Sequence, residues 1–358
     1  MKSLLRLLLK SQHRQNRYPQ AQTEKGMTLI ELLIGTVMAF LIITPMLGFV
    51  VDMLNTDRRE QVKSNTEQDI QAAVDFIAQD LSQAIYIYDN NDINVGTNGT
   101  PAIRNQLPDF GNQNRIPILV FWKRQLIKTS VPINSLTVKP NTCLPNNANQ
   151  CNDTYVLSLV AYYQFKDNND TWCQPLGDNC PTRIARYEIR DGLRNPNSPD
   201  KLNQPYYSNG ETNDSQKISQ GFNPNFDLTN KPMDKVTLGP PFPPHEVLVN
   251  YIDHTTGAAV QPIQKECENA LGNPTATAPG STTPSAIPET TLRVTDPDLA
   301  RATNSFYACV DKTTNLARVT IRGNSLRRLQ TDAKYDASKS AFFPTATVQV
   351  QGLGARGK

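Results

Sequence analysis

The chain has 358 residues, 38% of them hydrophobic and 19% charged. This size suits one membrane segment followed by one soluble domain of roughly 250 to 300 residues, or by two smaller domains. The net charge of +3 is uneven: residues 1–26 hold six basic residues and one acidic residue, whereas the rest of the chain holds 30 basic and 32 acidic residues. Because the basic excess belongs to the N-terminal segment alone, it does not support nucleic-acid binding, and we expect no nucleic-acid partner.

The first predicted element is a basic leader, residues 1–26, which is followed by a long apolar run. After Glu31 no charged residue occurs until Asp52, a gap of 20 residues. A helix of that length spans a hydrocarbon core of roughly 30 Å. We therefore predict a transmembrane helix over residues 27–54, with the leader on the cytoplasmic side and the C-terminal domain outside. A lone carboxylate at the head of such a span is costly in lipid, so we expect Glu31 to have a function.

Beyond the membrane, the helix is expected to continue as an amphipathic helix over residues 55–90. Pro45 lies in the apolar part, where the loss of a backbone hydrogen bond predicts a kink or local melting near residues 41–45. Further along, apolar residues recur at steps of three and four and predict one stripe that packs on a sheet: Ile70, Val74, Ile77, Leu81, Ala84, Ile85 and Tyr88.

Residues 91–358 are predicted to form a β-rich globular domain. Segments rich in Val, Ile, Tyr and Phe predict strands at 116–126, 135–138, 155–165, 183–190, 246–252, 305–310, 316–322 and 345–350. Few helical patterns separate them, which favours antiparallel pairing, with hairpins joining 155–165 to 183–190 and 305–310 to 316–322. The polar stretches 139–152, 191–245 and 272–290 are expected to be loop insertions. The predicted fold class is α+β, with a long N-terminal α-helix packed on an antiparallel β-sheet that carries long disulfide-bearing loops.

All six cysteines lie beyond the apolar run and predict disulfides in an oxidising compartment: Cys143, Cys151, Cys173, Cys180, Cys267 and Cys309. Zinc is the alternative, but the C-x7-C and C-x6-C spacings lack the short pairs that zinc sites use, so we expect no metal. Sequence alone does not determine the connectivity. We favour the pairs Cys143–Cys151, Cys173–Cys180 and Cys267–Cys309, because each closes a loop between or beside predicted strands.

The junction of the leader and the apolar run carries a specific motif. Lys25-Gly26-Met27-Thr28-Leu29-Ile30-Glu31, followed by about 20 apolar residues, resembles the N-terminal processing and methylation motif of type IV pilins and pseudopilins. The resemblance implies cleavage between Gly26 and Met27 by a prepilin peptidase, N-methylation of Met27 and a role for Glu31 in subunit assembly. It also implies that Pro45 supplies the helix kink of the family, although this proline lies closer to the amino end than is usual.

Length and pattern narrow the subclass. The long loops, the six cysteines and the segments 155–165 and 183–190 look like those of a large minor pilin or pseudopilin of the PilW-like kind. Residues 116–124 (IPILVFWKR), together with the length, are similar to cyanobacterial pseudopilins of the hormogonium polysaccharide secretion system, the HpsC-like group. This likeness implies a minor subunit of a type IV pilus-like apparatus that contributes to fibre assembly and to motility or polysaccharide secretion.

The same resemblance implies the partners and the location. The implied partners are the prepilin peptidase, other pilins or pseudopilins, pilus assembly proteins, the inner membrane and a polysaccharide. The protein would cross the bacterial inner membrane once, with its C-terminal domain in the periplasm, and would lie in a pilus or pseudopilus after assembly.

Other functions stay open at this point. One is a minor pseudopilin of a type II protein secretion system, and another is a membrane-anchored adhesin or binding module. We expect neither an enzyme nor a cofactor, because the sequence has no nucleophile elbow, P-loop or metal-binding pair. The runs 89–92 and 167–170 offer oxygen ligands for calcium but do not fit the EF-hand loop pattern, so turns are favoured. Trp122 and Trp172 are candidates for glycan or partner binding, although packing is the favoured role.

Overall fold

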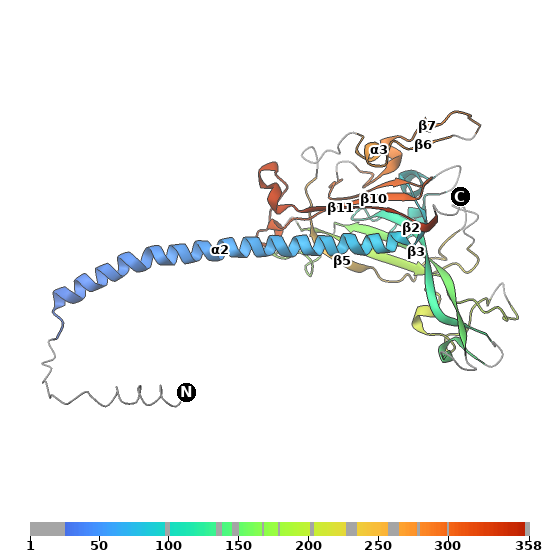
Figure 1. Cartoon of the computed structure of the whole chain (residues 1–358), viewed down its shortest axis with the longest axis horizontal. Helices are drawn as coiled ribbons and strands as arrows, with labels where there is room; N and C mark the ends of the chain where they lie inside the picture. The colour runs from blue at the N-terminus through green and yellow to red at the C-terminus, as the bar shows by residue number, and fades with distance from the viewer. Residues whose placement is uncertain are drawn as a thin grey trace, which may run out of the picture. The chain divides into compact units, whose positions relative to one another are not determined.

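The computed structural model describes residues 26–96, 101–133, 138–144, 150–166, 168–177, 180–200, 204–226, 235–256, 265–277, 280–298 and 301–354. The chain divides into two compact units, Met1–Asp57 and Arg58–Lys358. The first holds the start of the long helix, and the second holds the end of that helix and all the strands (Figure 1).

The longest element is α2 (Leu29–Ser82), a helix of 54 residues. Its buried side chains recur at steps of three and four and confirm the predicted stripe up to Leu81: Thr66, Ile70, Ala73, Val74, Ile77, Asp80 and Leu81. The predicted extension of the helix to residue 90 is wrong, because strand β1 (Ala84–Ile87) follows it directly. The β-branched and aromatic residues of β1 suit a pleated strand, and Tyr86 and Ile87 lie opposite Trp122 and Phe121 of the next strand.

The larger sheet has five antiparallel strands in the order β1-β2-β3-β4-β5. Its other members are β2 (Arg115–Pro132), β3 (Cys151–Phe165), β4 (Thr182–Arg190) and β5 (Glu246–Ile252). The predicted hairpin is confirmed by an unbroken register between β3 and β4, from Ser158 opposite Arg190 to Phe165 opposite Arg183. Beyond that register, β2 and β3 continue as a two-stranded ribbon away from the rest of the sheet (Figure 1).

The smaller sheet has four antiparallel strands in the order β11-β10-β9-β8. These are β8 (Arg293–Val294), β9 (Phe306–Asp311), β10 (Leu316–Arg322) and β11 (Thr345–Gln351). The second predicted hairpin, β9 with β10, is confirmed. The single sheet that the sequence suggested is therefore two sheets, to which β6 (Thr275–Ala276) and β7 (Ser285–Ala286) add a short ribbon.

Short helices and turns connect the strands. The α-helices are α3 (Glu266–Ala270) and α4 (Glu289–Leu292), η1 (Asn91–Val95) is a π-helix, and the 3-10 turns are η2 (Ile103–Gln106), η3 (Pro140–Thr142), η4 (Asp214–Gln216), η7 (Leu326–Arg328) and η8 (Ala337–Phe342). Of the predicted strand at 135–138, residues 135–137 lie outside the described part, and Val138 is not in a strand.

The main core forms where the α2 stripe meets both sheets. Trp122 is buried in it: its Nε1 donates to the Tyr88 hydroxyl at 2.9 Å, and its ring stacks on Phe226 with centroids 4.4 Å apart. Phe222, Phe226 and Val236 come from the stretch 191–245. This stretch, predicted as a loop insertion, therefore also completes the core.

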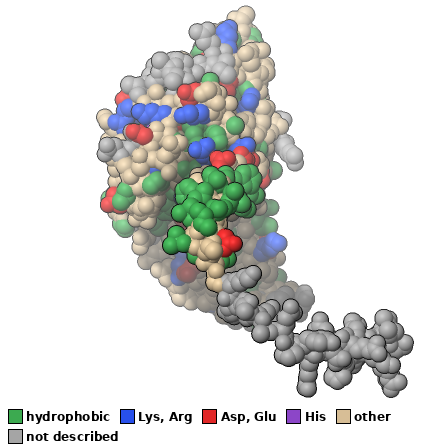
Figure 2. Space-filling model, turned by 90° about the vertical axis from the view of Figure 1, so that its left-hand side faces the viewer, with side chains coloured by type: hydrophobic (Ala, Val, Ile, Leu, Met, Phe, Trp, Pro, Cys, Tyr) green, Lys and Arg blue, Asp and Glu red, His purple; other side chains and the backbone are tan. Residues whose placement is uncertain are grey.

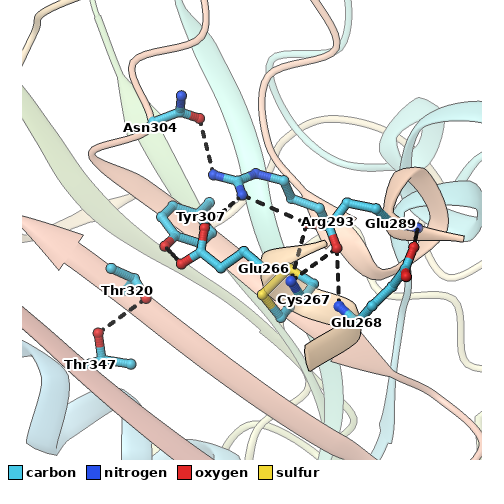
Figure 3. The surroundings of a disulfide bond; sticks show 10 residues. Glu266, Cys267, Glu268, Glu289, Arg293, Asn304, Tyr307, Thr320 and Thr347 are labelled. Carbon is cyan, nitrogen blue, oxygen red and sulfur yellow. Dashed lines mark hydrogen bonds and ion pairs between the residues drawn. A yellow bond between two sulfur atoms is a disulfide. The ribbon is translucent and has the colours of Figure 1, made fainter. Parts of the chain in front are cut away.

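Three disulfides staple the loops, and they join the pairs favoured above: Cys143–Cys151, Cys173–Cys180 and Cys267–Cys309. The third joins α3 to β9 and is fully buried. Beside it, the Glu289 carboxylate accepts hydrogen bonds from the backbone N–H groups of Cys267 and Glu268 (Figure 3). The start of α3 is thereby joined to β9 by a covalent bond and to α4 by charge-assisted hydrogen bonds.

Candidate functional site

The candidate site is the N-terminal segment, residues 26–54, which begins with a hydrogen-bonded cap. The backbone N–H and the hydroxyl of Thr28 each donate to Glu31 Oε2 at 3.0 Å, and the Glu31 N–H donates to Thr28 Oγ1 at 3.4 Å. This Thr-x-x-Glu capping box satisfies donors that the first turn of a helix otherwise leaves free. The cap was not predicted, although Thr-x-x-Glu ahead of an apolar run is its usual sequence signal.

Gly26 and Met27 precede the helix in exposed, non-helical backbone. The Met27 side chain is 78% exposed, and no atom lies within 4 Å of the position that a Cβ on Gly26 would occupy. The peptide bond between these residues is thus accessible. Cleavage at this bond and methylation of Met27 stay predictions, and residues 1–25 of the leader lie outside the described part of the chain.

The helix that follows carries apolar side chains on every side. Its best window has a mean hydropathy of 2.3, and none of that window is buried. Seen from its starting end in Figure 2, the segment is a dense cluster of hydrophobic side chains. A helix in the core of a soluble protein would bury such residues. Among the described residues, α2 is the one helix long and apolar enough to cross a membrane.

Pro45 lies within α2, and the helix is unbroken on both sides of it. Just before the proline, the Thr44 hydroxyl donates to the Phe40 carbonyl at 2.8 Å, as it does in a regular helical turn. The expected local melting near residues 41–45 is therefore not found in this structure, because proline removes only one donor from an otherwise intact ladder. The use of Pro45 as a kink stays a prediction.

A second group of charged residues, which sequence reasoning missed, lies where α2 packs on the larger sheet. Asp80 is ion-paired with Lys123 of β2 at 2.9 Å and with Arg186 of β4 at 2.8 Å. Glu188 of β4 is ion-paired with Lys123 at 3.5 Å and with Arg186 at 2.5 Å. The Tyr162 hydroxyl of β3 donates to Asp80 at 2.7 Å. The four charged side chains, here called the charge quartet, are 7–21% exposed and sum to zero charge.

The pKa values in the charge quartet follow from this pairing. Burial alone would raise the pKa of Asp80, but Lys123 and Arg186 outweigh it and hold that pKa below its usual value. The pKa of Glu188 is lowered by the same two cations against the effect of burial. Burial and the neighbouring Asp80 raise the pKa of Tyr162, which therefore stays a protonated donor. The quartet is thus a neutral set of ion pairs that joins α2 to β2 and β4, and the Tyr162 hydroxyl adds a hydrogen bond from β3.

The two carboxylates of the oxygen-rich run at residues 89–92 are ion-paired with a lysine of the same chain. The Lys312 ammonium lies 2.8 Å from Asp89 and 2.9 Å from Asp92, and both carboxylates are buried. A lysine of the same chain therefore pairs with the two carboxylates that calcium would use. The run is not the plain turn that was favoured, because Asn91 and Asp92 begin the π-helix η1. Residue 167 lies outside the described part, so the second run cannot be compared. Within the described ranges, no group of three or more His, Cys, Asp or Glu side chains could hold a metal ion.

Comparison with protein-family models, curated proteins and solved structures returns no match for this chain. Its class is therefore defined by its own features. It is an α+β protein with antiparallel sheets, three disulfides and one N-terminal helix capable of spanning a membrane.

Proposed function

We propose that this protein is a minor pilin or pseudopilin subunit of a type IV pilus-like apparatus, acting in fibre assembly and in motility or polysaccharide secretion. The observation that carries the proposal is an exposed apolar segment, residues 27–51, whose single carboxylate, Glu31, lies four residues after Met27. Cleavage after Gly26 would make Met27 the N-terminus and create a cationic amine there. In a bundle of such helices, the amine of one subunit can pair with Glu31 of the next.

The cap geometry is compatible with this pairing. Among the described residues, both Thr28 donors engage one carboxylate oxygen, Oε2, and the Glu31 side chain is exposed. The other oxygen is open to a neighbouring amine. Breaking an ion pair buried in apolar surroundings typically costs about 3–5 kcal/mol, enough to select one axial register of packed helices.

The location proposed with this function is the bacterial inner membrane, with the domain that follows the helix in the periplasm. The positive leader supports that orientation, since basic segments stay on the cytoplasmic side. Three disulfides support an oxidising compartment for the domain. After processing, the subunit would leave the membrane for the fibre.

Two substitutions separate the charge of Glu31 from its cap. E31Q keeps the capping box, because Gln serves at that position, but loses the charge; E31V loses both. If pairing with the amine drives assembly, both variants stay in the membrane fraction and are absent from sheared fibres. E60Q, an exposed carboxylate change on the same helix, is the matched control.

Three results would contradict the proposal. Wild-type incorporation of E31V into fibres would remove the assembly role, and an E31Q variant that assembles normally while E31V does not would assign Glu31 to helix capping. Mass spectrometry of the mature protein should find methylated Met27 at the N-terminus. An intact residue 1 in cells with active prepilin peptidase would leave only an anchored adhesin.

A further inference from the structure

The second unit carries a groove of about 610 Å³ between α2 and β5. This volume lies within the range of small-molecule sites. Phe76 and Asp69 of α2 lie on one side of the groove, and Asn250 and Tyr251 of β5 lie on the other. Trp172 and Arg328 also line the groove. Of the two tryptophans, therefore, Trp122 serves the core, whereas Trp172 faces a cavity.

The lining combines aromatic surface with planar polar groups. Phe76 is 43% exposed, although it lies on the amphipathic half of α2. The Arg328 guanidinium stacks over the Tyr251 ring at 4.3 Å from its centroid and is ion-paired with Asp69. Such a mixture offers flat apolar faces together with hydrogen-bonding groups at their edges.

Two polar atoms of the lining have no hydrogen-bond partner among the described residues. These are Oδ1 of Asn250 and Nε of Arg328, one an acceptor and the other a donor. The amide nitrogen of Asn250 is engaged, since it donates to the Trp172 carbonyl at 2.9 Å. Both atoms are buried and carry the free-energy cost of an unmade hydrogen bond, which a ligand in the groove could relieve once the Asn250 and Arg328 side chains turn toward it.

The backbone of the groove argues against an added β-strand as its occupant. β5 pairs with β4 through two irregular steps, and Tyr251 has a φ of 59°, which is rare for a bulky residue. An extended peptide needs a regular edge along which to form its ladder of hydrogen bonds. A purely apolar ligand is disfavoured as well, because it would take the Asp69–Arg328 ion pair and the Asn250 amide out of water without offering them new hydrogen bonds.

We propose that this groove binds a glycan chain. A sugar ring has apolar C–H faces, which pack on aromatic rings such as Trp172 and Phe76, and hydroxyls in its plane, which pair with carboxylate, amide and guanidinium groups. The groove supplies both on facing elements. This inference goes beyond the proposed assembly role and does not depend on it, since the groove lies wholly within the unit of residues 58–358.

The test measures binding by calorimetry with the full-length chain in detergent micelles. The probes are cellohexaose, a neutral chain, and hexagalacturonate, an acidic chain of equal length. We expect one of them to bind, and W172A and F76A each to weaken binding about tenfold, the scale of one lost aromatic contact. F110A is the matched control, because Phe110 is 62% exposed and lines a different cavity.

Trp172 and Phe76 lie in different parts of the fold, so if one variant misfolds, the other still tests the groove. Failure of both chains to bind the wild-type protein would overturn it, as would binding that neither W172A nor F76A weakens. Loss of subunit-to-subunit crosslinks in W172A, without glycan binding by the wild type, would assign the groove to a protein partner instead. Because soluble glycan binding needs no fibre, its failure is distinguishable from failure of the assembly role.

Discussion

Replacing Asp80 by Asn would convert the neutral charge quartet into a buried set with one excess positive charge. The change keeps the size of the side chain, so packing at this end of α2 is little altered. Lys123 and Arg186 would then share Glu188 alone, and each would lose its contact of 2.8–2.9 Å with a carboxylate. Asn can still accept a hydrogen bond from the Tyr162 hydroxyl.

The expected loss of unfolding free energy is about 3–5 kcal/mol. Removing one partner of a buried ion pair costs this much, because the remaining charge stays desolvated without compensation. The side chains of the quartet are at most 21% exposed, so solvent screening does not reduce the figure as it does for surface pairs. The double variant D80N/K123M removes one charge of each sign and should recover part of the loss.

Urea unfolding of the full-length chain in detergent, followed by tryptophan fluorescence, measures the effect as a shift of the midpoint at constant slope. D75N is the matched control: Asp75 lies on the same helix, is exposed and accepts a hydrogen bond from Gln71 at 2.9 Å. It should change stability by no more than about 0.5 kcal/mol. The reasoning fails if D80N stays within about 1 kcal/mol of the wild type, or if D80N/K123M is no more stable than D80N.

Three further predictions concern other parts of the second unit. Removing the Cys267–Cys309 disulfide, whose cysteines are 42 residues apart, should lower the unfolding free energy by about 4 kcal/mol through the chain entropy of the unfolded state. Removing Cys173–Cys180, which closes a shorter loop, should lower it by about 2.5 kcal/mol. Thermal unfolding of the two double serine variants would measure both losses. Burial lowers the pKa of His245, so below about pH 6.5 the unfolded state binds a proton that the folded state does not. The unfolding free energy should therefore fall as pH drops below about 6.5, by at most about 1.4 kcal/mol per pH unit. The same pH series measured on H245F should be flatter. K312M should lose about 2 kcal/mol in urea unfolding by leaving Asp89 without its cation, and adding D89N should restore part of it.

Local sequence patterns predicted correctly those features that depend on a single helix or on two strands joined as a hairpin. The stripe from Ile70 to Leu81 predicted the packing face of α2, and the β-branched segments predicted both hairpins. These patterns follow from the repeat of a helix or a strand, which each segment carries by itself.

Local patterns failed where two kinds of structure compete for one segment. Ala84, Ile85 and Tyr88 continue the helical spacing of α2, but Ala84 and Ile85 lie in β1 and Tyr88 directly follows it. The deciding interaction is the pairing of β1 with β2, whose residues lie far along the chain. Periodicity contains no information about such a partner, so tertiary pairing overrides the local preference.

The motif of the N-terminal segment could be recognised in the sequence without a fold. The basic leader, Gly26, the uncharged run and Glu31 are neighbours in the chain, so their chemistry is readable without a fold. The tertiary structure alone decided which tryptophan is buried, which cation neutralises Asp89 and Asp92, and how Asp80 meets Lys123 and Arg186. Each of these depends on strands and loops that are distant in sequence and adjacent in space, and only the packing of α2 on the sheets brings them together.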